Sequence, residues 1–164
     1  MVMSVADQSN NCFSKKEILS ILSVVKDPEI PVISIQELGI LQNVYVSGKT
    51  VQVDIIPTYS GCPAMHTIKT DIKQALVQHG VVDMEVKLLD KPIWTTDMIS
   101  PKGRAAMQAY GIAPPLSINE KNISCPQCNS AQTICISEFG STACKALYRC
   151  ESCLEPFDYF KCHA

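Results

Sequence analysis

Two short cysteine pairs near the end of this sequence constrain its fold more than any other feature. The pairs are Cys125-Pro126-Gln127-Cys128 and Cys150-Glu151-Ser152-Cys153, and 21 residues separate them. Two pairs of this kind can bring four thiolates to one tetrahedral metal centre. Residues 123–164 are too few to build a conventional apolar core, so a bound metal would supply the staple that a segment of this length needs.

The segment between the two pairs is long enough for two strands, such as Thr133–Ile136 and Ala146–Arg149. Strands framed by paired cysteines predict a zinc ribbon over residues 123–164, with Cys125, Cys128, Cys150 and Cys153 as the metal ligands. Zinc is the favoured structural metal, and iron is the alternative because a four-cysteine site also accepts it. Four buried cysteines without a metal would be the plain structural alternative.

Three further cysteines of the same region, Cys135, Cys144 and Cys162, are left over from this set. We expect Cys135 to lie on a strand as a small hydrophobic residue. Cys144 and Cys162 are candidates for a second soft-metal site or a redox pair, and a purely structural role is the alternative for both.

Composition narrows the classes of function. The sequence has no apolar run near the length of a membrane span, and its first residues lack the pattern of a signal peptide. We therefore expect a cytoplasmic protein whose nine cysteines are metal ligands or reactive thiols and not a disulfide framework. Residues 1–122 and residues 123–164 each carry a net charge of −1, so neither has the basic excess that nucleic-acid binding usually needs.

Patterning over residues 14–113 predicts an α+β fold in the order α-β-β-α-β. Ser14 and Glu17 form a capping-box pattern before a helix that should end near Lys26. A hairpin follows at residues 44–55, then a helix from Pro63 to about Gly80, a strand at residues 82–88 and a short helix between Ser100 and Gly111. We expect a disordered segment at 1–13, this domain at 14–113, a linker at 114–122 and the ribbon at 123–164.

Cys62 is the candidate functional residue of the first domain. It is the only cysteine between Cys12 and Cys125, and it stands just before the predicted helix at Pro63. Backbone N–H groups and the helix dipole at such a position favour a thiolate. A core cysteine is the structural alternative. A cysteine nucleophile assisted by His66 is a weaker interpretation, since no orienting partner for that histidine is evident, and a solvent-facing His66 is preferred.

The motifs of the first domain resemble a known family. Asp27-Pro28-Glu29-Ile30-Pro31, Glu37-Leu38-Gly39 and Thr58 to Pro63 are similar to motifs of the MIP18/DUF59 family of iron–sulfur assembly factors, over about residues 15–90. The resemblance implies that Cys62 handles a cluster or metal and that Asp27, Glu29 and Thr58 are motif residues. From the residues alone, Asp27 and Glu29 flank a proline and are expected to shape a turn.

A longer pattern resembles a more specific family. Its segments look like the PaaD (also called PaaJ) subunit family of the bacterial phenylacetyl-CoA 1,2-epoxidase system, and they run through nearly the whole chain: residues 94–97, 111–115, 137–145 and 156–162. This resemblance implies a place in aerobic phenylacetate breakdown beside an oxygenase and a reductase that carries an iron–sulfur cluster.

We therefore expect an accessory protein without turnover of its own. In this hypothesis a Cys62 thiolate holds a labile iron–sulfur cluster or iron, shared with a reductase or oxygenase subunit or with a second protomer, because one cysteine cannot cage a cluster. The alternatives are a scaffold that joins oxygenase and reductase, an electron-transfer or catalytic subunit, and a zinc-ribbon protein that binds nucleic acid. No nucleic-acid or membrane partner is expected.

Overall fold

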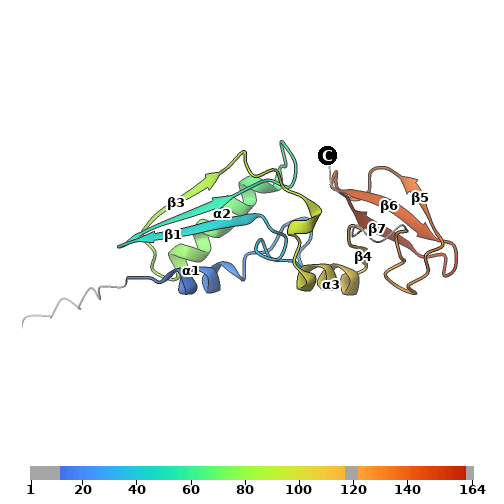
Figure 1. Ribbon diagram of the computed structural model, residues 1–164, viewed down its shortest axis with the longest axis horizontal. Coiled ribbons are helices and arrows are strands. Elements are labelled where there is room, and N and C mark those ends of the chain that lie inside the picture. The colour runs from blue at the N-terminus through green and yellow to red at the C-terminus, as the bar shows by residue number, and fades with distance from the viewer. Residues whose placement is uncertain (1–11, 117–121, 162–164) are drawn as a thin grey trace, which may run out of the picture.

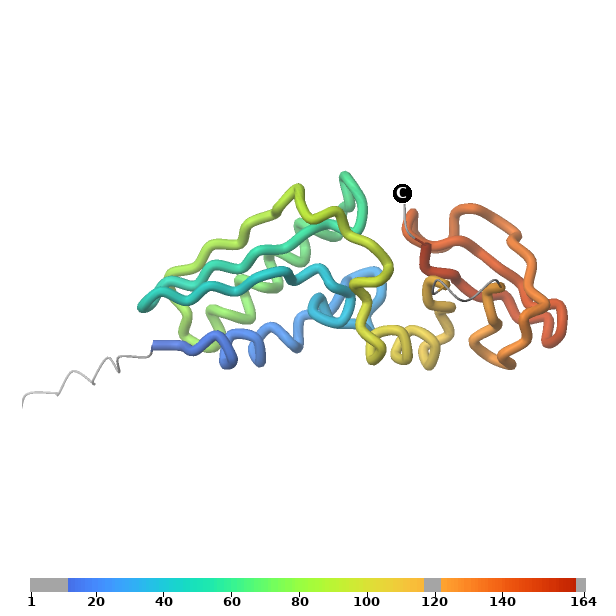
Figure 2. The backbone as a smooth tube through the Cα atoms, viewed as in Figure 1, coloured from blue at the N-terminus to red at the C-terminus, as the bar shows by residue number. Residues whose placement is uncertain are grey.

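The computed structural model describes residues 12–116 and 122–161. Most of the predicted disordered N-terminus, most of the predicted linker, and Cys162 lie outside these residues. The described chain forms two lobes, which Figures 1 and 2 show side by side with helix α3 between them. No helix in these two stretches combines the length and the apolar character that crossing a bilayer requires.

Helix α1 spans Lys15–Leu22 and begins with the predicted capping box. The Glu17 amide donates to Ser14 Oγ at 3.2 Å, and the Ser14 amide donates to Glu17 Oε2 at 2.7 Å. The predicted end near Lys26 is wrong, because the chain leaves the helix after Leu22. Backbone pairing with the next segment replaces the missing helical turn: the Ile35 amide donates to the Val25 carbonyl at 3.0 Å.

The first lobe contains a three-stranded sheet in the order β1-β2-β3, formed by Leu41–Ser47, Thr50–Ile55 and Asp83–Leu88. Strands β1 and β2 form the predicted antiparallel hairpin, and β3 runs parallel to β2. Parallel neighbours need a crossover, and helix α2, Ala64–Gln78, supplies it. The loop from β2 into α2 carries Cys62, so the hairpin and the crossover fix its place.

Helices α1 and α2 cover the sheet and enclose the main apolar core. Helix α1 packs against α2 and β1, and α2 packs against β3 (Figure 1). The predicted apolar stripe of α2 is buried in full, and it consists of Met65, Ile68, Ile72, Ala75 and Leu76. These positions recur at helical spacing, so one face of α2 points into the core while His66 on another face is exposed.

A short 3-10 helix, η1 at Thr96–Met98, and helix α3 at Pro101–Tyr110 lead from the first lobe to the second. Ser100 caps α3 by accepting from the Gly103 amide at 3.0 Å. Gly111 ends the helix in the left-handed region at φ 94°, which a glycine adopts without steric cost. Both boundaries agree with the sequence-based prediction.

The second lobe is a four-stranded sheet in the order β4-β7-β6-β5. Its strands are Ile112–Ala113, Thr133–Ser137, Lys145–Cys150 and Pro156–Phe160, numbered β4 to β7 in chain order. The sequence predicted β5 and β6 but neither β7 nor β4. Strand β4 follows α3 and pairs in parallel with β7. This pairing joins the chain after α3 to the sheet of the ribbon.

Part of the ribbon packs into the main apolar core of the first lobe. Trp94 of the first lobe is buried and meets Phe160 of β7 edge-on, with ring centroids 5.9 Å apart. The Trp94 Nε1–H group donates to the Leu38 carbonyl at 2.8 Å. Phe160 and Cys144 of the ribbon belong to the same buried cluster as the first-lobe core. This contact positions the ribbon loop that precedes β6 against the first lobe.

Candidate metal centre and the cysteine–carboxylate cluster

The four paired cysteines converge at the end of the second lobe. Their sulfur atoms all lie within 4.8 Å of one another, with Cys125 Sγ 3.7 Å from Cys153 Sγ and Cys128 Sγ 3.6 Å from Cys150 Sγ. These separations are far longer than a disulfide bond of about 2.05 Å. They suit sulfurs arranged around a central ion, because tetrahedral Zn–S bonds of about 2.3 Å place ligands nearly 4 Å apart.

Backbone amides favour a thiolate at Cys150, whereas the pKa of Cys128 and that of Cys153 are raised by hydrogen bonds among the sulfurs. The amides of Cys153 and Ser152 donate to Cys150 Sγ at 3.5 and 3.4 Å, and these hydrogen bonds lower the pKa of Cys150 to about 6. Each pair is followed by a residue with positive φ, Asn129 at 59° and Leu154 at 66°, so the chain turns back toward the centre. The four residues therefore fit a structural zinc ion in donor type and in spacing.

Cys62 lies in the loop before α2, one residue ahead of the helix N-cap at Pro63. The residue is half-buried. Burial raises the pKa of the Cys62 thiol, a backbone hydrogen bond from Ala64 lowers it, and the charge of Glu29 raises it further. The net pKa is above its ordinary value, which is opposite to the thiolate that a helix start alone predicts.

Tyr59 is a neighbour of Cys62 that sequence reasoning missed. Its hydroxyl hydrogen-bonds with the Cys62 side chain. Burial raises the pKa of Tyr59 to about 12, and the charges of Cys62, Glu29 and Cys144 raise it as well. Cys62, Glu29 and Cys144 therefore all lie within electrostatic range of the Tyr59 hydroxyl. The only available signal was its position three residues before Cys62.

Asp27 and Glu29 sit on the turn between α1 and the first sheet. Asp27 is buried, and its Oδ1 accepts from the amides of Glu29 and Ile30 at 2.8 and 2.9 Å. The predicted turn-shaping role of Asp27 is thus confirmed. Burial raises the pKa of Asp27, although the two backbone hydrogen bonds oppose this shift. The turn holds Glu29 in a fixed backbone position.

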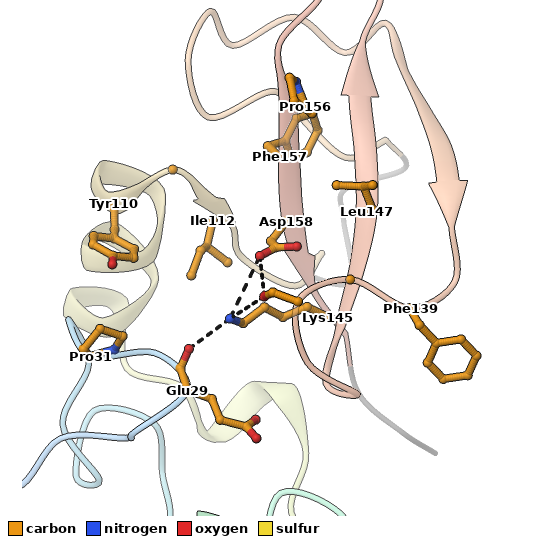
Figure 3. Close-up of a pocket in the computed structure, with 13 residues that line it drawn as sticks. Glu29, Pro31, Tyr110, Ile112, Phe139, Lys145, Leu147, Pro156, Phe157 and Asp158 are labelled. Carbon is orange, nitrogen blue, oxygen red and sulfur yellow. Dashed lines mark hydrogen bonds and ion pairs between the residues drawn. The ribbon is translucent and has the colours of Figure 1, made fainter.

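Glu29 is the point where the ribbon meets the first lobe. Cys144 Sγ donates to Glu29 Oε2 at 3.1 Å, and Lys145 Nζ donates to the Glu29 carbonyl at 2.9 Å. Figure 3 shows Lys145 reaching toward this carbonyl and toward Asp158, whose carboxylate is 4.0 Å away, in a cavity of about 650 Å³ between the lobes. Burial raises the pKa of Cys144 to about 12, and its hydrogen bond to Glu29 adds to that shift.

The remaining predicted residues lie apart from this cluster or outside the described chain. Thr58 is half-buried and lines a separate cavity of about 380 Å³ that Trp94 also borders. Cys135 is exposed on β5, so the expectation of a packed hydrophobic residue is wrong there. The proposed pairing of Cys144 with Cys162 concerns a residue beyond the described ranges, and Cys144 instead contacts Glu29.

The fold and the cysteine centre define a class of protein: an α+β module packed against a zinc ribbon. Residues 15–88 match the family described as "Iron-sulfur cluster assembly protein", and residues 114–161 match the family described as "PaaD zinc beta ribbon domain". The crystal structure of a DUF59 domain from Bacillus anthracis superposes with a TM-score of 0.54 and 25% identity, over 57% of this chain and 90% of that one.

Two curated relatives narrow the assignment. The chain is 47% identical to a putative 1,2-phenylacetyl-CoA epoxidase subunit of Escherichia coli (strain K12), over 89% of its own length and 92% of that protein. It is 35% identical to an "Fe-S protein maturation auxiliary factor" of Porphyromonas gingivalis, over 56% of its length and 90% of that protein. The chain belongs to the PaaD family, and both resemblances drawn from its motifs are confirmed.

Proposed function

We propose that this protein is an accessory subunit of a phenylacetyl-CoA 1,2-epoxidase system that assists the assembly or maintenance of an iron–sulfur cluster, or of a di-iron centre, in its partners. The chain covers 92% of its epoxidase relative from Escherichia coli, so the likeness extends over both lobes. Its first module matches iron–sulfur assembly proteins. In this proposal the protein acts in the cytoplasm and has no turnover of its own.

The observation that carries the proposal is the setting of Cys62. It is the only cysteine of the module at residues 15–88, it stands on a loop fixed by β2 and α2, and the residue is half-buried. A thiol must lose its proton before it binds iron. Because burial and Glu29 raise the pKa of Cys62, the free thiol stays protonated at neutral pH, and metal binding itself must displace the proton.

The ribbon contributes a structural and docking module in this proposal. Zinc at the four-cysteine centre would hold β5, β6 and β7 together where the apolar core is small. Several large apolar side chains of the ribbon are exposed, and they are Ile134, Ile136, Phe139 and Leu154. A partner protein could bury them.

The test is a comparison of variants in cells that depend on phenylacetate. We expect Cys62→Ser to lower the cluster content of the partner reductase, or the iron content of the oxygenase, while the variant protein itself accumulates normally. Cys135→Ser is the matched control, because Cys135 is an exposed cysteine on the far module. Full metal loading of both partners in the Cys62→Ser strain would contradict the proposal.

A scaffold that joins the partner subunits is the second candidate, and the exposed apolar residues of the ribbon favour it. This candidate predicts complex formation that does not depend on Cys62. Phe139→Ser, which removes an exposed aromatic ring, should then weaken co-purification with the partners, while Cys62→Ser should leave both co-purification and partner metal loading unchanged.

A further inference from the structure

Cys144 is a second cysteine next to the proposed cargo site, and it comes from the other lobe. It lies between β5 and β6, is only 4% exposed, and donates from Sγ to Glu29 Oε2 at 3.1 Å. Glu29 belongs to the first lobe and is 115 residues away in sequence. Cys144 of the ribbon therefore faces the motif turn of the first lobe, which is the turn at residues 27–31. Cys144 precedes the start of β6, whereas the four-cysteine centre lies at the other end of that strand.

The position of Cys144 is fixed by contacts on both sides. Lys145, which is 5% exposed, donates to the Glu29 carbonyl at 2.9 Å and to Ser141 Oγ at 3.1 Å. The Lys161 amide donates to the Cys144 carbonyl at 2.9 Å. The facing turn is held by Asp27, which accepts two backbone hydrogen bonds. Because the backbone is anchored on either side, only side-chain rotation is needed to change what the Cys144 sulfur contacts.

Cys62, on the loop before α2, is a third residue near the contact between Cys144 and Glu29. The Glu29 carboxylate that accepts from Cys144 also acts electrostatically on Cys62. The Tyr59 hydroxyl hydrogen-bonds with Cys62 and lies within electrostatic reach of Cys144. Two sulfurs, one carboxylate and one phenol thus gather where the lobes meet.

The chemistry of this group suits a thiophilic ion. Two cysteine thiolates are soft donors that iron and zinc accept, and the Glu29 carboxylate beside Cys144 can take up a released proton. Within residues 12–116 and 122–161, only the ribbon cysteines form a set of three or more ligands packed within 4.8 Å. The two sulfurs and the Glu29 carboxylate are therefore not all within 4.8 Å of one another, so metal binding requires side-chain rotation at Cys62 or Cys144.

We propose that Cys62 and Cys144 together bind a thiophilic metal ion, alone or as part of an iron–sulfur cluster, with Glu29 receiving the Cys144 proton. The inference rests on the proposed function and supplies the second thiol that one cysteine alone lacks. In the binding step each S–H bond breaks and a sulfur–metal bond forms. The Cys144 proton passes to Glu29 Oε2, the Cys62 proton passes to solvent, and no electron is transferred.

Cobalt(II) is a suitable probe for counting the sulfurs. The full-length protein is first loaded with one equivalent of zinc per chain, which the four-thiolate ribbon centre takes in preference to a two-thiol site and keeps against cobalt. Cobalt(II) is then titrated, and its thiolate charge-transfer absorption is recorded per bound ion. If two thiolates bind, Cys62→Ser and Cys144→Ser should each lower this absorption to about half of the wild-type value, in proportion to the ligands left. Cys135→Ser should leave it unchanged.

Further readouts separate a ligand from a merely structural residue. Each variant should retain one zinc per chain, which shows that the ribbon is intact. Glu29→Gln keeps both sulfurs, so it should preserve the absorption per bound ion while raising the cobalt Kd by about tenfold, the usual effect of losing an outer partner. Zinc retention together with wild-type absorption in Cys144→Ser would overturn the inference.

The outcomes also separate this inference from the proposed function. If Cys62→Ser loses the absorption and Cys144→Ser keeps it, Cys62 binds without Cys144, so the two-thiol site fails while the accessory role stands. If neither variant changes the absorption, the bound ion lies elsewhere and both proposals fail. If both variants lose about half, the two-thiol site is supported.

Discussion

At the scale of single residues, Glu37 shows how a motif residue can be structural. Its carboxylate accepts from the Ser34 amide at 2.8 Å and from Ser34 Oγ at 2.9 Å, and it pairs with Lys102 Nζ at 2.9 Å. Its own carbonyl accepts from the Ser100 amide at 2.8 Å. Glu37 therefore connects the turn after α1 to the start of α3. The sequence identified Glu37 as part of a motif but did not predict these hydrogen-bond partners.

Glu37→Gln should destabilise the fold in a pH-dependent way. The Lys102 and Ser34 hydrogen bonds lower the pKa of Glu37 from 4.5 to about 2. A carboxyl group with a lowered pKa contributes stability above its unfolded value, and the contribution is lost as the pH falls from about 4.5 toward 2. We expect a loss of about 1–2 kcal/mol at pH 7 that vanishes near pH 2. Urea unfolding at several pH values measures the difference in unfolding free energy between the variant and the wild type.

The control for Glu37 is Glu85→Gln, which removes an exposed carboxylate 3.4 Å from Lys87. Exposed ion pairs contribute little, so its effect should stay within about 0.5 kcal/mol. A loss for Glu37→Gln that is equally large at pH 7 and pH 2 would contradict the electrostatic explanation.

Gly39→Ala tests a second motif residue. Gly39 has φ +78°, and an added Cβ would lie 2.6 Å from Met98 Cβ and 2.7 Å from the Met98 carbonyl oxygen. Gly48 at φ +60° has nothing within 4 Å of an added Cβ, so Gly48→Ala carries the backbone strain alone. We expect about 1 kcal/mol of destabilisation for Gly48→Ala and clearly more, about 3 kcal/mol, for Gly39→Ala. Equal losses in thermal unfolding would show that Met98 moves aside freely.

At the scale of elements, the sequence predicted what local patterns encode. Helices α2 and α3, the β1–β2 hairpin and the β5–β6 pair follow from apolar spacing, caps and turns, and they agree with the structure. Strand β7 was missed because it begins at Pro156 and lies directly after a cysteine pair, and β4 because a strand of two residues has no pattern. The end of α1 depends on pairing with residues 33–35, which no local signal shows.

The residues of the candidate site were likewise predictable only where the local sequence determines their geometry. The four ribbon cysteines form the predicted cluster because their spacing constrains their geometry. The neighbours of Cys62 could not be predicted, since the Cys144–Glu29 contact spans 115 residues and depends on how the two lobes pack. Burial of the thiol, with the charge of Glu29 adding to it, reverses the pKa shift expected for Cys62.

Metal removal should act on the ribbon elements. Strands β5, β6 and β7 enclose only a small apolar cluster of Ala113, Cys125, Cys150 and Phe157, so the sheet depends on the four-cysteine centre. We expect a strong chelator to release one zinc per chain and to disorder this sheet while α1 and α2 persist in circular dichroism. Trp94 is the only tryptophan and contacts Phe160, so its fluorescence should shift at the same time. A chelated protein with unchanged Trp94 fluorescence would show that the ribbon folds without metal.

At the scale of the whole molecule, the two lobes act as one body because their contacts are buried. Trp94 with Phe160 supplies the apolar part, and Lys145 with the Glu29 carbonyl supplies the polar part. The ribbon loop is consequently held against the motif turn, and the proposed cargo site depends on this packing. A protein in which the lobes separate should lose Cys144 from the site without losing its zinc.

Lys145→Met tests that dependence. Methionine keeps the length of the side chain but removes the donor to the Glu29 carbonyl and the charge 4.0 Å from Asp158. Losing one partner of a buried polar group is costly, so we expect about 2–4 kcal/mol of destabilisation. Because the contact joins the lobes, a protease should also cut faster between α3 and β5, with zinc still at one per chain. Lys49→Met is the control, since Lys49 is exposed at the β1–β2 turn and should change neither property. Unaltered proteolysis in Lys145→Met would mean that the lobes stay together without the Lys145 contact.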